Sequence, residues 1–187
     1  MSEISFEDIK NALQRLLVGD LFGNIEHQTV ILQENDVSAK LKEVKIIDVP
    51  DDSILIKIDY GEAYNNIFRS ENGHLKRCDY LLIVNDIYKR NKILLFIEMK
   101  SKKVDKDEII QKFHASECLL DYIVSILRHF HKIGFNLDKC TKRFVLFHQI
   151  SIDKKRVRPV KEGSKPEDYF SIKFNPQKPP TLKLLSK

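Results

Sequence analysis

The chain has 187 residues, of which 42% are hydrophobic and 32% are charged, and its formal net charge is +5. This length suits one domain with a single core, and no stretch approaches the roughly 20 apolar residues that cross a bilayer. The N-terminus lacks the basic start and apolar run of a signal peptide, and the three cysteines form no Cys-x-x-Cys pair. We therefore expect a cytoplasmic protein with reduced thiols and no membrane partner.

A helix is predicted over residues 5–18, because apolar side chains recur there at helical spacing. Ser5 is a suitable N-cap for this helix, and Gly19 is a suitable stop. The residues that follow, 20–43, show no consistent period, and we assign no element to them.

Two strands are predicted next, over residues 45–49 and 54–60. The turn between them, residues 50–53, starts with a proline that presets one backbone dihedral angle, and its two aspartates can accept backbone hydrogen bonds. Residues 61–75 are polar and irregular, and we expect a loop with a helical turn there.

Two apolar runs, residues 80–84 and 93–97, lie on either side of a polar connector. A hairpin with its turn at the middle of this connector places Leu81 opposite Phe96. Both runs are apolar at successive positions, so each strand needs cover above and below the sheet.

The same pairing places Asp79 opposite Glu98, and period-two alternation puts Lys100 on their face of the sheet. Directly opposite residues have Cβ atoms about 4.5–5.5 Å apart, and two carboxylates that close repel unless a cation or a shared proton lies between them. The pairing therefore predicts a metal site with an ammonium group beside it. A slip of one residue would move one acid to the other face. Without further context, the simpler interpretation is two solvated acids at strand ends, with Lys100 as their ion-pair partner.

A long helix is predicted from Lys106 to about His131, with Asp105 and Glu108 as a capping box. Its apolar stripe covers one face of the sheet, and residues 144–147 indicate a further buried strand. The order of helix, three strands, helix and strand predicts an α/β fold: a three-layer α/β/α core around a central mixed sheet of four or more strands.

Residues 151–187 form a C-terminal extension to a domain that spans residues 1–150. The extension contains ten Lys and Arg residues, four acids and five of the six prolines, so its net charge is +6. We expect it to be extended, with one possible strand over 169–174, and to pack on the domain or reach from it. Its charge suits a polyanionic partner, but a solvated tail explains the charge equally well.

The combination of Asp79, Glu98 and Lys100 resembles the PD-(D/E)XK, or restriction-endonuclease-like, nuclease superfamily. The resemblance covers roughly residues 54–150, and Cys78 replaces the proline that names the motif. The Gln-x-x-x-Tyr signature of the RecB-like branch is absent, so no subfamily is indicated.

The resemblance implies a Mg²⁺-dependent nuclease, with Mn²⁺ as a substitute for Mg²⁺. Asp79 and Glu98 would bind the metal together with the backbone carbonyl of Met99, because Mg²⁺ keeps several waters and needs few protein ligands. Lys100 would orient the attacking water or stabilise the developing oxyanion.

Further residues are candidates for the same chemistry. Gln111 would bond the attacking water or a phosphate, and Lys112 would contact the nucleic-acid backbone, although an exposed structural role is equally open for both. Other candidates are Lys102 and Lys103 for nucleic-acid binding and Glu62 or Glu7 for a third acid of the metal site.

We expect from the resemblance a metal-dependent endonuclease that prefers DNA to RNA, in the manner of the nuclease subunits of antiviral defence or mobile-element systems. The alternative is a catalytically inactive nuclease fold that serves as a nucleic-acid-binding or assembly subunit. The chain is short for a separate recognition domain, so a homodimer or a partner protein would supply the targeting.

Overall fold

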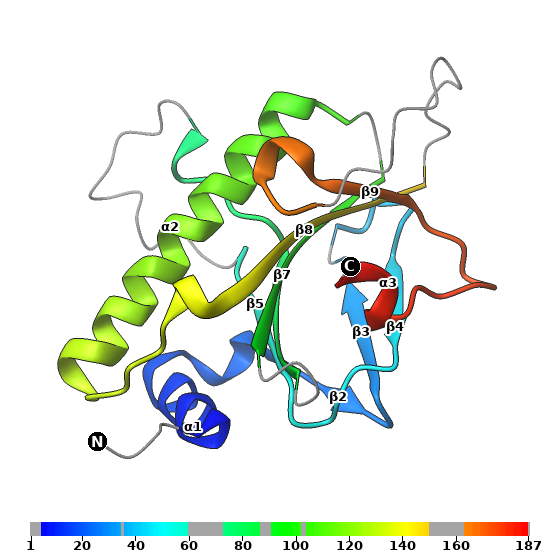
Figure 1. The fold of residues 1–187 in the computed structure, drawn as a ribbon. Helices are drawn as coiled ribbons and strands as arrows, with labels where there is room; N and C mark the ends of the chain where they lie inside the picture. The colour runs from blue at the N-terminus through cyan, green and yellow to red at the C-terminus, as the bar shows by residue number, and fades with distance from the viewer. Residues whose placement is uncertain are drawn as a thin grey trace.

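The computed structural model describes residues 5–34, 36–59, 73–86, 91–101, 104–149 and 163–186. These residues form a mixed α/β fold around a six-stranded sheet, beside which a three-stranded sheet packs (Figure 1). The six-stranded sheet consists, in spatial order, of β1 (Phe22–Gly23), β5 (Ile54–Lys57), β6 (Tyr80–Asp86), β7 (Asn91–Lys100), β8 (Cys140–His148) and β9 (Phe170–Lys173). The three-stranded sheet consists of β2 (Ile25–Glu26), β3 (Thr29–Gln33) and β4 (Glu43–Ile47).

The helices of the described residues are unequal in length. The α-helices are α1 (Phe6–Leu16), α2 (Lys106–Phe130) and α3 (Leu182–Leu185), and short 3-10 turns lie at η1 (Gly19–Leu21), η3 (Leu137–Lys139) and η4 (Pro166–Asp168). The two helices that the sequence predicts are confirmed as α1 and α2. Among the described residues, no helix combines the length and the apolar character that a membrane crossing requires.

Strands β6 and β7 pair in the register that the sequence predicts. Leu81 faces Phe96 and Val84 faces Ile93 in an antiparallel ladder. Leu81 lies in one buried cluster of the protein and Leu82 in a second cluster on the opposite face. The prediction that both faces of these strands are covered is therefore confirmed.

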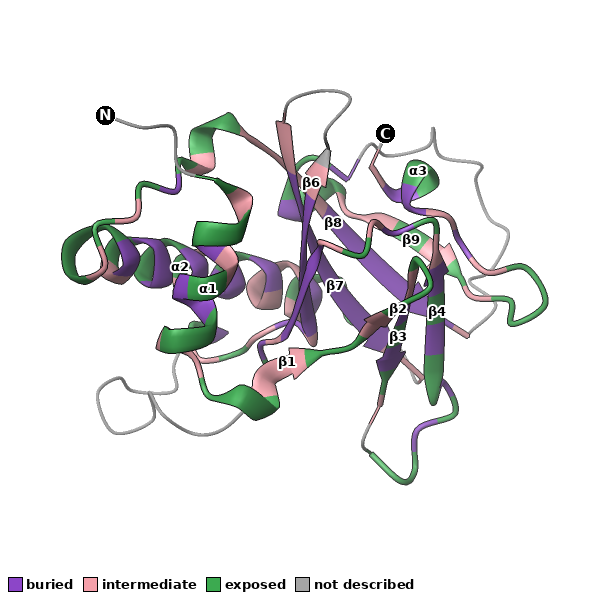
Figure 2. Ribbon diagram, turned by 90° about the horizontal axis from the view of Figure 1, so that it is seen from below, coloured by how far each residue is buried: buried purple, intermediate pink, exposed green. Residues whose placement is uncertain are grey.

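Helices α1 and α2 cover one face of the six-stranded sheet (Figure 2). Ser5 is the N-cap of helix α1. Its hydroxyl accepts the Asp8 N–H, while the Asp8 carboxylate accepts the Ser5 N–H. Between α2 and the sheet, Phe96 stacks on Phe144 with ring centroids 5.0 Å apart, and Phe113 of α2 meets Phe144 edge-on at 5.3 Å. This face therefore has the helical layer that the sequence predicts.

The opposite face is covered mainly by β-strands, so the predicted α/β/α layering is correct for one face only. Residues 20–43, to which no element was assigned from sequence, form η1 and strands β1 to β3. In β3, Val30 and Leu32 are fully buried while Ile31 between them is exposed, which is the alternation of a strand with one face on a core. The turn over residues 50–53, where the Ser53 N–H donates to the Pro50 carbonyl at 3.0 Å, carries the chain from one sheet to the other.

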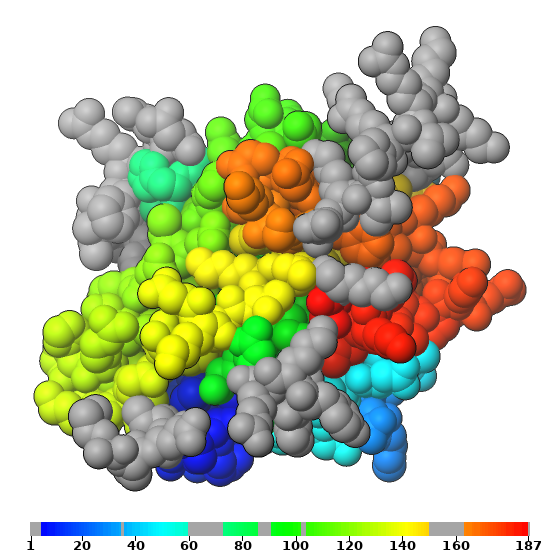
Figure 3. All heavy atoms as spheres, viewed as in Figure 1, coloured from blue at the N-terminus to red at the C-terminus, as the bar shows by residue number. Residues whose placement is uncertain are grey.

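The described part of the C-terminal extension, residues 163–186, packs on the body of the protein. Its predicted strand is confirmed as β9, which pairs in parallel with β8. Helix α3 buries Leu182 and Leu185 against the second core, and Thr181 forms a bridge with Ile47 at the edge of β4. In the space-filling view, the orange and red atoms of this segment border the cyan atoms of the three-stranded sheet (Figure 3).

Candidate functional site

The two predicted acids and their lysine lie on the α2 face, at the edge of the sheet where β6 begins and β7 ends. The last strand pair joins Tyr80 to Ile97, so the register continued by one residue places Asp79 opposite Glu98. Strand β7 buries Phe96 under α2, and alternation turns Glu98 and Lys100 to the same side. The structure thus brings the three residues to one place.

Asp79 is held by the backbone of its neighbouring strands. Its carboxylate accepts the Met99 N–H at 2.6 Å, and its own carbonyl accepts the Ile58 N–H at 3.0 Å. Because β6 begins only at Tyr80, the carboxylate takes the place of a strand partner for Met99. The N–H and C=O groups of one strand residue point to the same edge, so the Met99 carbonyl faces the side on which Asp79 lies.

Glu98 is fully buried and lies between two lysines. Lys112 of α2 donates to its Oε1 at 2.8 Å, and Lys100 Nζ lies 3.3 Å from the same oxygen. Lys100 also donates to Glu108 Oε1 at 3.1 Å. The second carboxylate oxygen, Glu98 Oε2, is buried and has no hydrogen-bond partner among the described residues.

The acids share one environment and affect each other's protonation. Burial, with a contribution from the charge of Glu98, raises the pKa of Asp79 to about 8. Burial also raises the pKa of Glu98, although Lys112 and Lys100 oppose this shift. For Lys112, burial lowers the pKa, but attraction to Glu98 and Asp79 outweighs burial and raises the pKa overall. Burial therefore favours the protonated form of both acids.

The donor set fits a small hard cation. Asp79 and Glu98 offer carboxylate oxygens, and the unpartnered Glu98 Oε2 is a buried acceptor of the kind that Mg²⁺ binds. Within the described ranges, no group of three or more His, Cys, Asp or Glu side chains could hold a metal. A metal here would depend on two carboxylates, the Met99 carbonyl and water.

The Lys112 side chain of α2 is turned toward Glu98. Its side chain is only 13% exposed and its ammonium group is directed to Glu98, because position 112 of α2 lies above the end of β7. It is therefore a charge partner of Glu98 in this structure, and its contact with the nucleic-acid backbone stays a prediction.

Gln111 packs against the segment that leads to Asp79. A Cβ atom added at Gly73 would collide with Gln111 Oε1, and Gly73 has a φ of +72°, which favours glycine. Lys102 and Lys103 lie outside the described residues, as does Glu62. Glu7 is exposed on the first turn of α1.

Sequence reasoning missed three residues near the site. Glu34 contributes to the raised pKa of Asp79, and Asp59 contributes to that of Lys112, so both acids lie within electrostatic reach. Asp59 follows β5, which pairs with β6, and a search for acids at the same sheet edge would have found it. Glu34 follows β3, in the region that had no assignment.

The third missed residue is Ser116 of α2, which is 1% exposed. Its hydroxyl donates to the Lys112 carbonyl at 2.7 Å and accepts the Cys78 N–H at 2.9 Å. It therefore joins the segment before Asp79 to the helical turn that carries Lys112.

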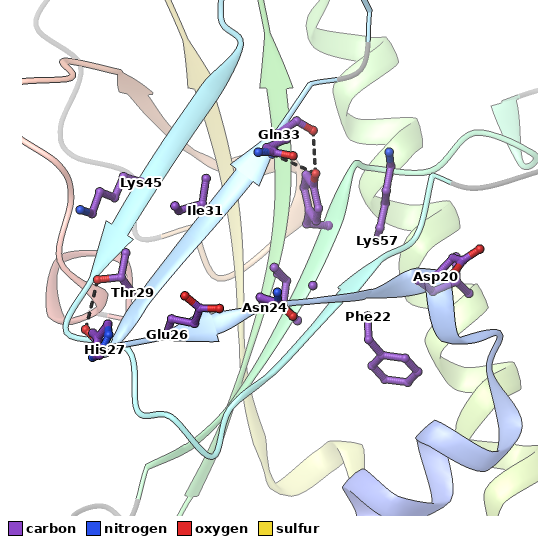
Figure 4. A pocket seen from close by; sticks show the side chains of 14 residues that line it. Asp20, Phe22, Asn24, Glu26, His27, Thr29, Ile31, Gln33, Lys45 and Lys57 are labelled. Atoms are coloured by element: carbon purple, nitrogen blue, oxygen red, sulfur yellow. Dashed lines mark hydrogen bonds between the residues drawn. The ribbon is translucent and has the colours of Figure 1, made fainter.

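A separate hollow of about 650 Å³ lies on the other face of the sheet, between β1, β5 and the outer face of the three-stranded sheet (Figure 4). Tyr80 closes its end nearest Asp79 by donating its hydroxyl to the Gln33 carbonyl at 2.6 Å and accepting the Gln33 N–H at 3.0 Å. The charged residues that line it are balanced in sign: Asp20, Glu26, Lys45 and Lys57. Balanced charges give this hollow no preference for a polyanion.

The chain matches no family model, no curated protein and no solved structure. Its chemistry has to be inferred from the site itself. The site offers the buried Glu98, the half-buried Asp79, a strand-end carbonyl and two lysines on one carboxylate.

Proposed function

We propose that the chain is a divalent-metal-dependent endonuclease that hydrolyses phosphodiester bonds in DNA. The observation that carries this proposal is the gathering of Asp79, Glu98 and Lys100 at one edge of the sheet, where Glu98 Oε2 is buried and has no hydrogen-bond partner among the described residues. The element order α1, β5, β6, β7, α2 and β8, with β8 parallel to β7, supports it because the resemblance to PD-(D/E)XK nucleases implies that order. The choice of DNA over RNA rests on this resemblance.

Each residue of the site has a task in this proposal. Asp79, Glu98 and the Met99 carbonyl would hold Mg²⁺, which when bound lowers the pKa of a water and offsets phosphate charge. The Lys100 side chain is 23% exposed, so its ammonium can donate to a phosphate oxygen and stabilise the negative charge that develops there. Lys112 favours the ionised form of Glu98 from the buried side. A homodimer or a partner protein would bring the site to both strands.

Cleavage assays on plasmid DNA, single-stranded DNA and RNA test this proposal. We expect cleavage of DNA with Mg²⁺ or Mn²⁺ and none with EDTA. Glu98→Gln keeps the shape of the side chain but removes its charge, and Lys100→Met removes the ammonium, so each should lower the cleavage rate about 100-fold or more.

The chain contains its own matched control, because Glu43 and Lys45 repeat the Glu-x-Lys pattern on β4 of the other sheet. Glu43→Gln and Lys45→Met should cleave at the wild-type rate, and circular dichroism melting should show all four variants folded. Undiminished cleavage by both Glu98→Gln and Lys100→Met would refute the assignment.

One observation favours a second function, a nuclease fold without activity that binds nucleic acid or assembles with a partner. Lys100 and Lys112 already neutralise Glu98 without a metal. A calorimetric titration that measures Mn²⁺ binding to the protein distinguishes the two functions. Binding that is lost in Asp79→Asn supports the endonuclease, and a wild-type protein that binds no Mn²⁺ supports the inactive subunit.

A further inference from the structure

We propose that the substrate strand crosses the end of the six-stranded sheet, from Lys76 on one side of the acid pair to Lys173 on the other. The inference rests on the proposed function, because it names the path of the phosphodiester chain through the same site.

Lys173 lies in the same row across the sheet as Lys100. Strands β7, β8 and β9 are parallel, so they end at the same edge, and Lys100 partners His148, which partners Lys173. Neighbouring strands lie about 4.8 Å apart, so the Cα atoms of Lys100 and Lys173 are about 10 Å apart along this edge.

Lys173 also lies on the face of the acid pair. Phe170 and Ile172 of β9 pack against the core on the opposite face, so alternation turns Lys173 to the α2 side. Lys173 is exposed, whereas His148, which lies between Lys100 and Lys173 in the row, is only 3% exposed. The row thus places an exposed lysine beyond Lys100 on the β9 side.

Lys76 lies on the other flank of the site. The segment that contains it crosses α2, since Gly73 packs against Gln111 and the Cys78 N–H bonds Ser116. Lys76 is exposed. The hydrogen bond from Lys100 lowers the pKa of Glu108, and the charge of Lys76 adds to this shift. Lys76 is therefore close to the site on the β6 side.

These positions match what a polyanionic strand requires. A strand with its scissile phosphate at Asp79 and Glu98 must carry further phosphates past both sides of the pair. The acids repel those phosphates, and an exposed lysine on each side offsets the repulsion. The hollow on the other face has balanced charges, so it offers no competing path.

Binding of a DNA oligonucleotide with one mapped cut site, measured by fluorescence anisotropy in EDTA over a series of salt concentrations, tests this path. Lys76→Gln and Lys173→Gln should each weaken binding about threefold to tenfold at low salt and reduce the salt slope by about 0.7–0.9. Lys139→Gln is the matched control, because Lys139 is also exposed but precedes β8 at the opposite end of the sheet.

Shortened oligonucleotides test the direction of the path. Removal of nucleotides on one side of the cut should abolish the difference between the wild type and Lys173→Gln. Removal on the other side should abolish the effect of Lys76→Gln.

The outcomes separate this path from the function on which it rests. If the wild type cleaves and the two flanking variants bind like Lys139→Gln, the path is overturned and the endonuclease stands. If the wild type neither binds nor cleaves nucleic acid, the proposed function fails and the path with it. If Lys76→Gln, Lys173→Gln and Lys139→Gln all lose the same DNA affinity, the attraction is unspecific, and this result also overturns the path.

Discussion

At the scale of single residues, the two lysines of the candidate site are shared unevenly between its two acids. Asp79 and Glu98 lie within electrostatic reach of each other, but both lysines contact one oxygen of one acid, Glu98 Oε1. Asp79 has a backbone N–H as its partner, and Glu98 Oε2 has none among the described residues. This imbalance makes the pH dependence of stability a direct test of the geometry.

Asp79→Asn should remove a pH dependence that the wild type shows in EDTA. Burial, with the charge of Glu98, raises the pKa of Asp79 from 3.8 to about 8, so the native state keeps a proton that the unfolded chain has already lost. The stability contributed by this protonation is complete below about pH 4 and is lost as the pH rises toward 8.

Urea unfolding at pH 5 and pH 8 measures this effect as a difference between the two proteins. The wild type should lose more free energy of unfolding than Asp79→Asn between these values. Asp51→Asn, on an exposed turn, should follow the wild type. Equal pH dependence in wild type and Asp79→Asn would contradict the raised pKa of Asp79.

At the scale of elements, side-chain bonds between segments determine how the site is assembled. The predicted N-cap of α2 is confirmed, because Asp105 accepts the N–H groups of residues 107 and 108. The Glu108 carboxylate, which a capping box would direct to the cap, instead accepts from Lys100 of β7. Ser116 connects the same helix to the segment before Asp79.

Ser116→Ala should lower the free energy of unfolding by about 1–3 kcal/mol, because it leaves the buried Cys78 N–H without its acceptor. Ser53→Ala is the matched control, since the Ser53 hydroxyl is also buried but has no hydrogen-bond partner within the described part of the chain. It should leave stability nearly unchanged. Chemical denaturation measures both values, and equal losses would show that the Ser116 contacts do not matter.

At the scale of the whole molecule, the C-terminal extension completes the second face of the sheet. Without β9 and α3, the second core would lose Leu182, Leu185 and the partly buried Phe170 from its cover. The extension is thus part of the folded unit over residues 163–186. Its five basic residues between 154 and 161 lie outside the described ranges.

Two neighbouring leucines of α3 test this role. Leu185 is 2% exposed, so Leu185→Ala should lower the free energy of unfolding by about 2–5 kcal/mol. Leu184 is 42% exposed, so Leu184→Ala should change it by less than about 0.5 kcal/mol. Thermal and chemical unfolding measure the difference, and similar values for the two variants would mean that α3 does not cover the core.

The sequence by itself determined the elements whose pattern is local and strong. Periodicity and caps specified α1 and α2, and the two apolar runs with their connector specified the β6–β7 register and so the meeting of Asp79 with Glu98. Only the tertiary structure decided that strands cover the second face, that Lys112 turns inward to Glu98, and that Ser116 joins α2 to the Asp79 segment. These features depend on contacts between segments far apart in the chain, and the spacing of residues within one segment carries no information about such contacts.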